Sequence, residues 1–309
     1  MNNRFTPRDY TAALAVVVLW GLNFVAMKFA LRDFTPFQLG AARYVFAVLP
    51  LIFLVRRPSL PWQWLLLYGL SQGVGQFGFL FSALQVGMTA SLASVLMQTQ
   101  VFFTAIFSYW LLREKPSRPL AWGLALAACA LLCFGISVVG GGALAAVTGL
   151  GLALNLCAAA MWAASNLLAR RAQTSAPTSA ADSAPASAPR FDPLGFVVWS
   201  SLVPVLPFCL MSYVFDAPSR SLQWLQAPWT SWVAVAYLGW LATILAYALW
   251  TGLLTRHAAN RVAPFSLGVP VVGLTTGMWV LGETISTWQW GGIAFVMAAL
   301  ACVLVFGRR

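Results

Sequence analysis

Amide, hydroxyl and aromatic side chains recur at helical spacing inside stretches that are otherwise apolar. In 62–84, for example, Gln72, Gln76 and Phe79 share one helical face. We expect further residues of this kind to line the same cavity and to bind a small substrate: Asn23, Gln98, Trp162, Asn166 and Tyr247. Amide and hydroxyl groups can also bond one helix to another, for about 0.6 kcal/mol each, and that alternative remains open for each residue.

Arg43 is a single cation within LGAARYVFAVLP, residues 39–50. It lies roughly 10 Å along a helix from Pro36 at about 1.5 Å per residue, and a charge at the centre of a bilayer costs about 2.5 to 3.5 kcal/mol. All seven carboxylates fall at the ends of the apolar stretches or in loops, so none is expected inside the membrane to pair with it. Its partner is either a set of helix C-terminal carbonyls or the carboxylate of a substrate, so Arg43 joins the predicted substrate-binding residues with both readings open.

Two prolines, Pro264 and Pro270, flank Gly268 in the stretch 260–281. Each proline removes a backbone donor, which a membrane protein tolerates where neighbours or a cavity satisfy the freed carbonyl. The pattern predicts a broken helix that acts either as a gate or as a static kink.

The sequence lacks the groups that an enzyme, metal site or cofactor site would need. HExxH is absent, every carboxylate falls at the end of an apolar stretch or in a loop, and the five cysteines have no metal-ligand neighbours. The only histidine, His257, is expected in a cytoplasmic loop, so we predict weak or no obligate proton coupling. We expect a protein that is not an enzyme and has no metal and no cofactor.

The elements that hold these residues are predicted to be membrane helices. Hydrophobic residues make up 61% of the 309 residues and charged residues 8%, against about 25% charged in a soluble domain. Ten stretches have about the 20 residues that a span needs. They are 10–31, 36–55, 62–84, 89–111, 119–139, 147–169, 191–214, 229–254, 260–281 and 287–307. The lipid bilayer is therefore an expected partner.

The net charge of +11 is distributed by side of the membrane, which argues against nucleic acid as a partner. The basic residues gather before the first stretch and behind every second one, except Lys28, Arg32, Arg43 and Arg220. The positive-inside rule then predicts that both termini are cytoplasmic.

Self-comparison indicates a duplication. At an offset of 169, Trp110, Glu114 and Cys133 match Trp279, Glu283 and Cys302. We predict repeats at 1–145 and 146–309, with a flexible linker at 172–190. Five helices per repeat turn the second copy upside down, so Glu114 is expected inside and Glu283 outside. Inverted repeats are typical of secondary carriers with alternating access.

Several segments resemble a known family: VVVLWGLNFVAMK, ARYVFAVLPLIFLVRRP, RVAPFSLGVPVVGL and GQFGFLF through QTQVFF. They are similar to the EamA branch of the drug/metabolite transporter superfamily, near its cysteine and O-acetylserine exporters. The resemblance implies ten helices in two inverted five-helix repeats. It also implies export of neutral amino acids or related metabolites across the bacterial inner membrane. A broad-specificity drug or metabolite exporter and a passive facilitator or channel remain alternatives, and the oligomeric state stays open, a monomer included.

Overall fold

A computed structural model describes residues 5–112, 118–140, 147–174, 192–257, 262, 265–266 and 268–302. All regular structure in these residues is helical, and they contain no strand. The prediction of an all-helical fold is therefore confirmed. Five helical runs are long and apolar enough to cross a membrane: Pro7–Ala30, Pro36–Phe53, Gly149–Ala172, Pro193–Phe215 and Trp229–Trp250.

The first two helices begin at capping boxes. In α1 (Pro7–Ala30), the Thr6 hydroxyl accepts from the Asp9 backbone N–H, and the Asp9 carboxylate accepts from the Thr6 backbone N–H at 3.0 Å. Thr35 and Gln38 exchange the same two bonds at the start of α2 (Pro36–Val48). Each box satisfies backbone donors that a helix start otherwise leaves unpaired.

The remaining helices follow the predicted stretches and pass from one helical geometry to another within several of them. They are α3 (Trp62–Tyr68), η2 (Gly69–Phe77) and α4 (Gly78–Gln85); α5 (Ala90–Leu96), η3 (Met97–Thr99) and α6 (Gln100–Leu112); α7 (Arg118–Gly140); α8 (Gly149–Thr174); α9 (Pro193–Ser201) and α10 (Val205–Phe215); α11 (Trp229–Ala236), η6 (Tyr237–Leu245) and α12 (Ala246–Arg256); α14 (Gly268–Leu281); and α15 (Thr287–Ala301).

Some predicted boundaries are wrong. The stretch 36–55 is helical only to Val48, before Pro50 and a short 3-10 turn, and 191–214 is interrupted between α9 and α10. The linker starts later than predicted because α8 continues to Thr174, and residues 175–191 lie outside the described part of the chain. Pro264 also lies outside it.

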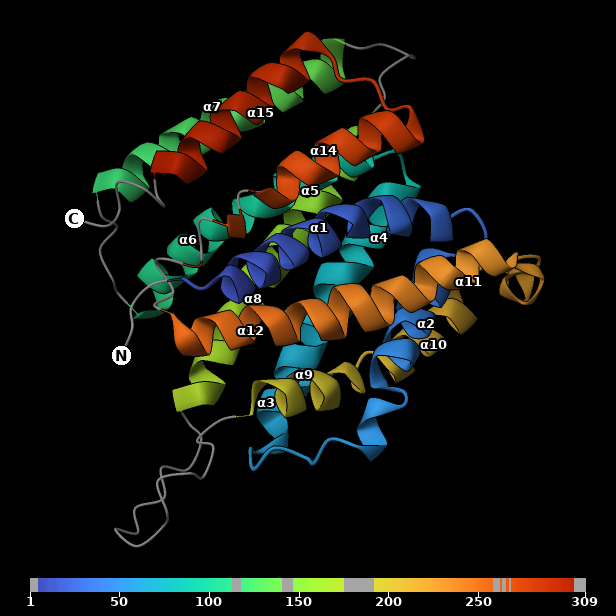
Figure 1. Ribbon diagram of the computed structural model, residues 1–309. Helices are drawn as coiled ribbons and strands as arrows, with labels where there is room; N and C mark the ends of the chain where they lie inside the picture. The colour runs from blue at the N-terminus through green and yellow to red at the C-terminus, as the bar shows by residue number, and fades with distance from the viewer. Residues whose placement is uncertain are drawn as a thin grey trace, which may run out of the picture.

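Helices from the two ends of the chain pack side by side. In Figure 1, α7 pairs with α15 at one edge of the bundle and α1 lies against α14. The approach of α1 to α14 is close at Gly21, where a Cβ would lie 2.4 Å from the Cβ of Val272. A residue larger than glycine would therefore separate these two helices.

Two π-helical segments of nine residues each lie inside longer helical runs. η2 lies between α3 and α4, and η6 lies between α11 and α12. Each of these is the third helical run on its side of residues 141–146. η2 and η6 start at Gly69 and Tyr237, which are 168 residues apart (237 − 69), close to the repeat offset of 169. π-helical turns are rare, and they are frequent at functional sites.

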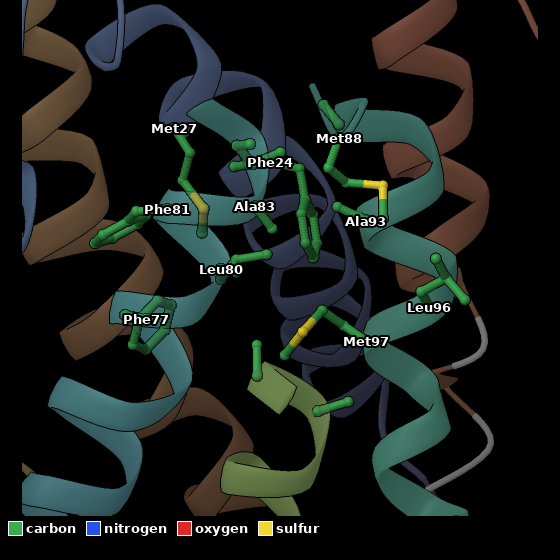
Figure 2. Close-up of a cluster of buried hydrophobic side chains, with 14 of the residues drawn as sticks. Phe24, Met27, Phe77, Leu80, Phe81, Ala83, Met88, Ala93, Leu96 and Met97 are labelled. Atoms are coloured by element: carbon green, nitrogen blue, oxygen red, sulfur yellow. The ribbon is translucent and has the colours of Figure 1, made fainter. Parts of the chain in front are cut away.

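Apolar side chains from α1, α4 and α5 fill the bundle near the end of α1. Figure 2 shows Met27 and Phe24 of α1 beside Leu80 and Ala83 of α4, with Met88 and Leu96 opposite. We name this group the apolar plug; it comprises Phe24, Met27, Leu80, Phe81, Ala83, Met88, Ala93, Leu96 and Met97. All of these side chains are buried, so this end of the bundle is closed.

Candidate functional site

A cavity of about 270 Å³ lies in the middle of the bundle, next to the apolar plug. It is bordered by residues of α1, α2, η2, α4, α5, η3, α6, α8, η6, α12, α14 and α15. Most of the predicted substrate-binding residues line it: Asn23, Arg43, Gln76, Gln98, Trp162, Asn166 and Tyr247. The structure thus brings together polar residues that are up to 224 positions apart in the sequence (247 − 23).

Arg43 is 2% exposed and held by neutral groups. Its Nε and one terminal nitrogen donate to the Thr243 hydroxyl at 3.2 and 3.0 Å, and the other terminal nitrogen donates to the Asn23 side-chain oxygen at 3.3 Å. The Phe77 ring lies 3.8 Å from the guanidinium carbon, a cation–π geometry. These contacts come from side chains and not from helix C-terminal carbonyls, which were one of the two kinds of partner that the sequence left open.

The guanidinium has five N–H groups, and the bonds to Thr243 and Asn23 use three of them. No carboxylate is paired with Arg43 in the described part of the chain. Because Arg43 also borders the cavity, a solute carboxylate could accept from the remaining two N–H groups in a forked geometry.

Gln72 does not border this cavity but supports one of its walls. Its side-chain N–H₂ donates to the Tyr247 hydroxyl, and its oxygen accepts from the Ser165 hydroxyl at 3.1 Å. Tyr247 in turn meets Trp20 edge-on, with ring centroids 5.3 Å apart, and Trp20 donates to the carbonyl of Ala242 at 3.1 Å. Gln72 therefore orients an aromatic wall.

Three more amides serve different parts of the cavity. Gln76 is 4% exposed, and its side-chain oxygen has no hydrogen-bond partner among the described atoms. Gln98 donates to the carbonyl of Ser266 at 3.4 Å, and Asn166, which is exposed, donates to the Gln100 side-chain oxygen at 3.0 Å. An unpartnered buried amide is costly unless a ligand or water completes it.

Phe79 lies away from the cavity, 38% exposed. We placed it on the face of Gln72 and Gln76 by assuming about 3.6 residues per turn. That prediction is wrong because η2 has wider i→i+5 turns, which rotate the later residues. Phe77 and Leu80 face the cavity instead.

The structure assigns Pro270 to the first turn of α14, since that helix begins at Gly268. Proline breaks no helical hydrogen bond in this position.

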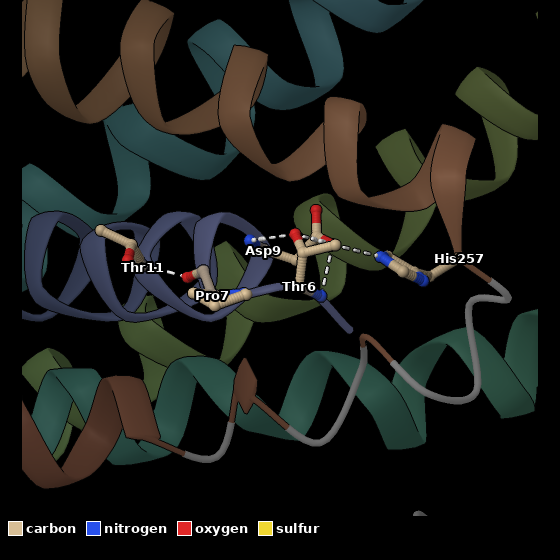
Figure 3. Close-up of polar contacts among 5 residues, drawn as sticks. All are labelled: Thr6, Pro7, Asp9, Thr11 and His257. Carbon is tan, nitrogen blue, oxygen red and sulfur yellow. Dashed lines mark hydrogen bonds and ion pairs between the residues drawn. The ribbon is translucent and has the colours of Figure 1, made fainter. Parts of the chain in front are cut away.

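His257 follows the end of α12 and is buried. Its Nε2 lies 3.0 Å from the Asp9 carboxylate (Figure 3), and its ring stacks on the Phe5 ring with centroids 4.0 Å apart. Asp9 is also the capping residue of α1, so the pair joins the start of α1 to the end of α12. Neither residue lines the cavity.

Thr243 and Phe77 were missed as site residues by sequence reasoning. Thr243 gives one signal, since it is the single hydroxyl among the aliphatic residues of TILAYAL before Tyr247. The amide, hydroxyl and aromatic side chains that line the cavity can form hydrogen bonds and ring contacts with a bound solute. The described residues contain no group of three or more His, Cys, Asp or Glu that could hold a metal.

Comparison with known proteins identifies the family of the chain. The EamA-like transporter family model matches residues 9–136 and again 149–305. The chain belongs to the EamA-like transporter family. As a family member with long apolar helices, it is a multi-pass membrane protein and a transporter.

Relatives of this EamA-like transporter carry similar names. A probable amino-acid metabolite efflux pump of Salmonella typhimurium is 38% identical, covering 98% of this chain and 96% of that protein. A protein of the same description in Escherichia coli is 36% identical with the same coverage. A solved crystal structure with 18% identity aligns with a TM-score of 0.60, over 98% of this chain and 99% of its own, and shows that the fold is shared.

Proposed function

We propose that this transporter is a secondary carrier that exports neutral amino acids or related small metabolites from the cytoplasm across the inner membrane. The observation that carries the proposal is Arg43: a buried guanidinium on the cavity wall with two N–H groups that no described residue uses. The names of the Salmonella and Escherichia relatives support amino-acid metabolites as the substrate class.

The charge of the cavity supports a zwitterion over a cationic drug. Among the described lining residues, Arg43 is a cation and none is a carboxylate. A substrate carboxylate would meet Arg43, and the substrate ammonium would meet neutral amides and ring faces such as those of Gln76 and Trp20. In this proposal Asn23, Gln98, Trp162, Asn166 and Tyr247 form the rest of the binding surface, and Gln72 acts through Tyr247.

The proposed architecture is ten spans in two inverted repeats, 1–145 and 146–309, with both termini in the cytoplasm. The two matched family segments support the duplication. The two π-helices, 168 residues apart, support it independently (237 − 69). With this orientation the apolar plug lies on the outer side.

Alternating access then requires the apolar plug to separate when the cavity opens outward. Pro270, in the first turn of α14, stays a proposed gating residue. Pro264 stays a candidate gate residue by its sequence position alone.

Counterflow in proteoliposomes separates a carrier from a passive facilitator or channel. Unlabelled amino acid outside should accelerate the exit of labelled amino acid from the lumen by a saturable process. A panel of amino acids, with and without a pH gradient, identifies the substrate and any proton coupling. Exit that is indifferent to outside substrate would indicate a pore, and preference for organic cations would indicate a drug exporter.

A further inference from the structure

A second cavity, separate from the central one, runs along the side of the bundle between α1 and α11. We name it the α1/α11 groove; it has a volume of about 680 Å³ and shares no lining residue with the central cavity. Its walls are apolar and comprise Leu22, Val25, Ala26, Phe29, Val233 and Ala234. Val233 is 55% exposed, so the groove opens to the surroundings of the bundle.

One end of the groove carries two opposite charges next to each other. Arg32 is exposed and lies over the Phe29 ring at 4.5 Å, and Asp33 accepts a hydrogen bond from the Ser231 hydroxyl at 2.5 Å. No ion pair joins Arg32 to Asp33 among the described residues. The hydrogen bond from Ser231 engages one oxygen of the Asp33 carboxylate and holds this negative charge at the end of the groove.

Nearby charged groups are already engaged, which leaves Arg32 available. Lys28 donates to the carbonyl of Leu84 at 3.0 Å, and the Glu283 carboxylate accepts from two backbone N–H groups at the start of α5. Arg32 borders both this region and the groove.

The length of the groove fits one leaflet of a membrane. Leu22 and Arg32 are ten residues apart on and just beyond α1, about 15 Å at 1.5 Å per residue, which is half of a hydrocarbon core of about 30 Å. The apolar walls therefore lie at acyl-chain depth when the charged end lies at the headgroups.

We propose that the α1/α11 groove binds one phospholipid of the phosphatidylethanolamine class. An acyl chain packs between α1 and α11, the phosphate accepts from the Arg32 guanidinium, and the primary ammonium donates to the Asp33 carboxylate. A choline head has no N–H to donate, and a glycerol head brings no cation to Asp33. The proposal needs the chain to lie in a membrane and is independent of the substrate that is exported.

The test is native mass spectrometry of the full-length protein in detergent, titrated with lipids of identical acyl chains and ethanolamine, choline or glycerol heads. The wild type should retain the ethanolamine lipid about tenfold more tightly than the other two. Arg32→Gln should weaken all three lipids, because all carry the phosphate. Asp33→Asn should abolish only the preference for ethanolamine.

Two further variants separate local from general effects. Arg220→Gln removes another exposed cation outside the groove and should leave all three affinities unchanged. Ala234→Phe fills the groove and should remove the retained lipid while the thermal midpoint in detergent stays near that of the wild type. Equal retention of the three lipids by the wild type, or unchanged retention in both Arg32→Gln and Asp33→Asn, would overturn the proposal.

Discussion

Arg43 is stabilised by neutral groups from distant parts of the chain, a hydroxyl 200 positions away and an amide 20 positions away. These bonds hold the guanidinium in place and leave it on the cavity wall. The structural interpretation of Arg43 and the proposed substrate contact, both of which the sequence left open, are therefore compatible with each other.

Arg43→Gln should raise the half-saturation concentration for transport by at least about tenfold, because a charge-assisted bond to the substrate is lost. Transport kinetics in proteoliposomes measure it, with size-exclusion chromatography to check folding. Thr243→Val is the matched control: it disturbs the arginine but leaves its charge, and should cause a smaller rise. A folded Arg43→Gln protein with wild-type kinetics would exclude Arg43 from substrate binding.

Gln76→Ala and Trp162→Ala should each lower transport efficiency by about tenfold while expression stays normal, since each removes a contact in the cavity wall. Phe79→Ala is the matched control, from the same helical run as Gln76. Its side chain faces away from the cavity, so uptake should equal that of the wild type. Loss of uptake in Phe79→Ala alone would contradict the assigned geometry.

At the scale of elements, the sequence predicts most helices well because apolar stretches and capping residues are local signals. The second helix starts at Pro36 as predicted, and the first starts at Pro7, three residues before the predicted position 10. The predicted cavity-facing positions agree with the structure where the helical turns are regular, as for Trp162 and Asn166 in α8. They fail at Phe79, because a change from α to π geometry depends on packing against other helices, which composition does not encode.

The π-helix η6 is positioned by a close approach to α2. A Cβ on Gly239 would lie 2.5 Å from the Phe46 Cβ and 2.9 Å from the Arg43 carbonyl oxygen. Gly239→Ala should therefore lower the free energy of unfolding by about 1 to 3 kcal/mol, as overpacking does. The thermal midpoint in detergent measures the effect.

Gly135→Ala is the control for that substitution. Gly135 lies in α7, and a Cβ there meets no atom within 4 Å. The added helix propensity should leave stability unchanged or raise it by up to about 1 kcal/mol. If both variants have the same thermal midpoint, close packing of η6 on α2 is not what holds the two elements together.

For the whole molecule, the two sequence halves meet at both ends of the bundle. Gly282, with φ of +66°, turns the chain after α14 so that the Glu283 carboxylate accepts from the backbone N–H groups of Ala90 and Ser91 at 2.7 and 2.8 Å. These two hydrogen bonds attach the connection between α14 and α15 to the start of α5, beside the apolar plug.

Glu283→Ala should loosen this end of the bundle, because two charge-assisted bonds are lost. With the native cysteines replaced and Met88→Cys introduced into the plug, labelling by a membrane-impermeant maleimide from outside should become about tenfold faster. Glu283→Gln, which keeps an acceptor oxygen, should give a smaller increase. Equal labelling rates in all three proteins would show that the Glu283 hydrogen bonds to the start of α5 do not hold the plug closed.

The proposed inversion of the repeats has its own test in intact cells. Glu114→Cys should react with an impermeant maleimide only after the cells are opened, whereas Thr284→Cys, which is exposed at the end next to the plug, should react from outside. Reaction of both from the same side would refute the inverted arrangement.

The Arg43 guanidinium has a further consequence for the energetics of the cell. It is a fixed positive charge along the route through the bundle, and no described carboxylate neutralises it. Such a charge raises an electrostatic barrier to protons and metal cations. A solute with no net charge does not meet that barrier, so the proposed carrier can move it repeatedly without dissipating the membrane potential.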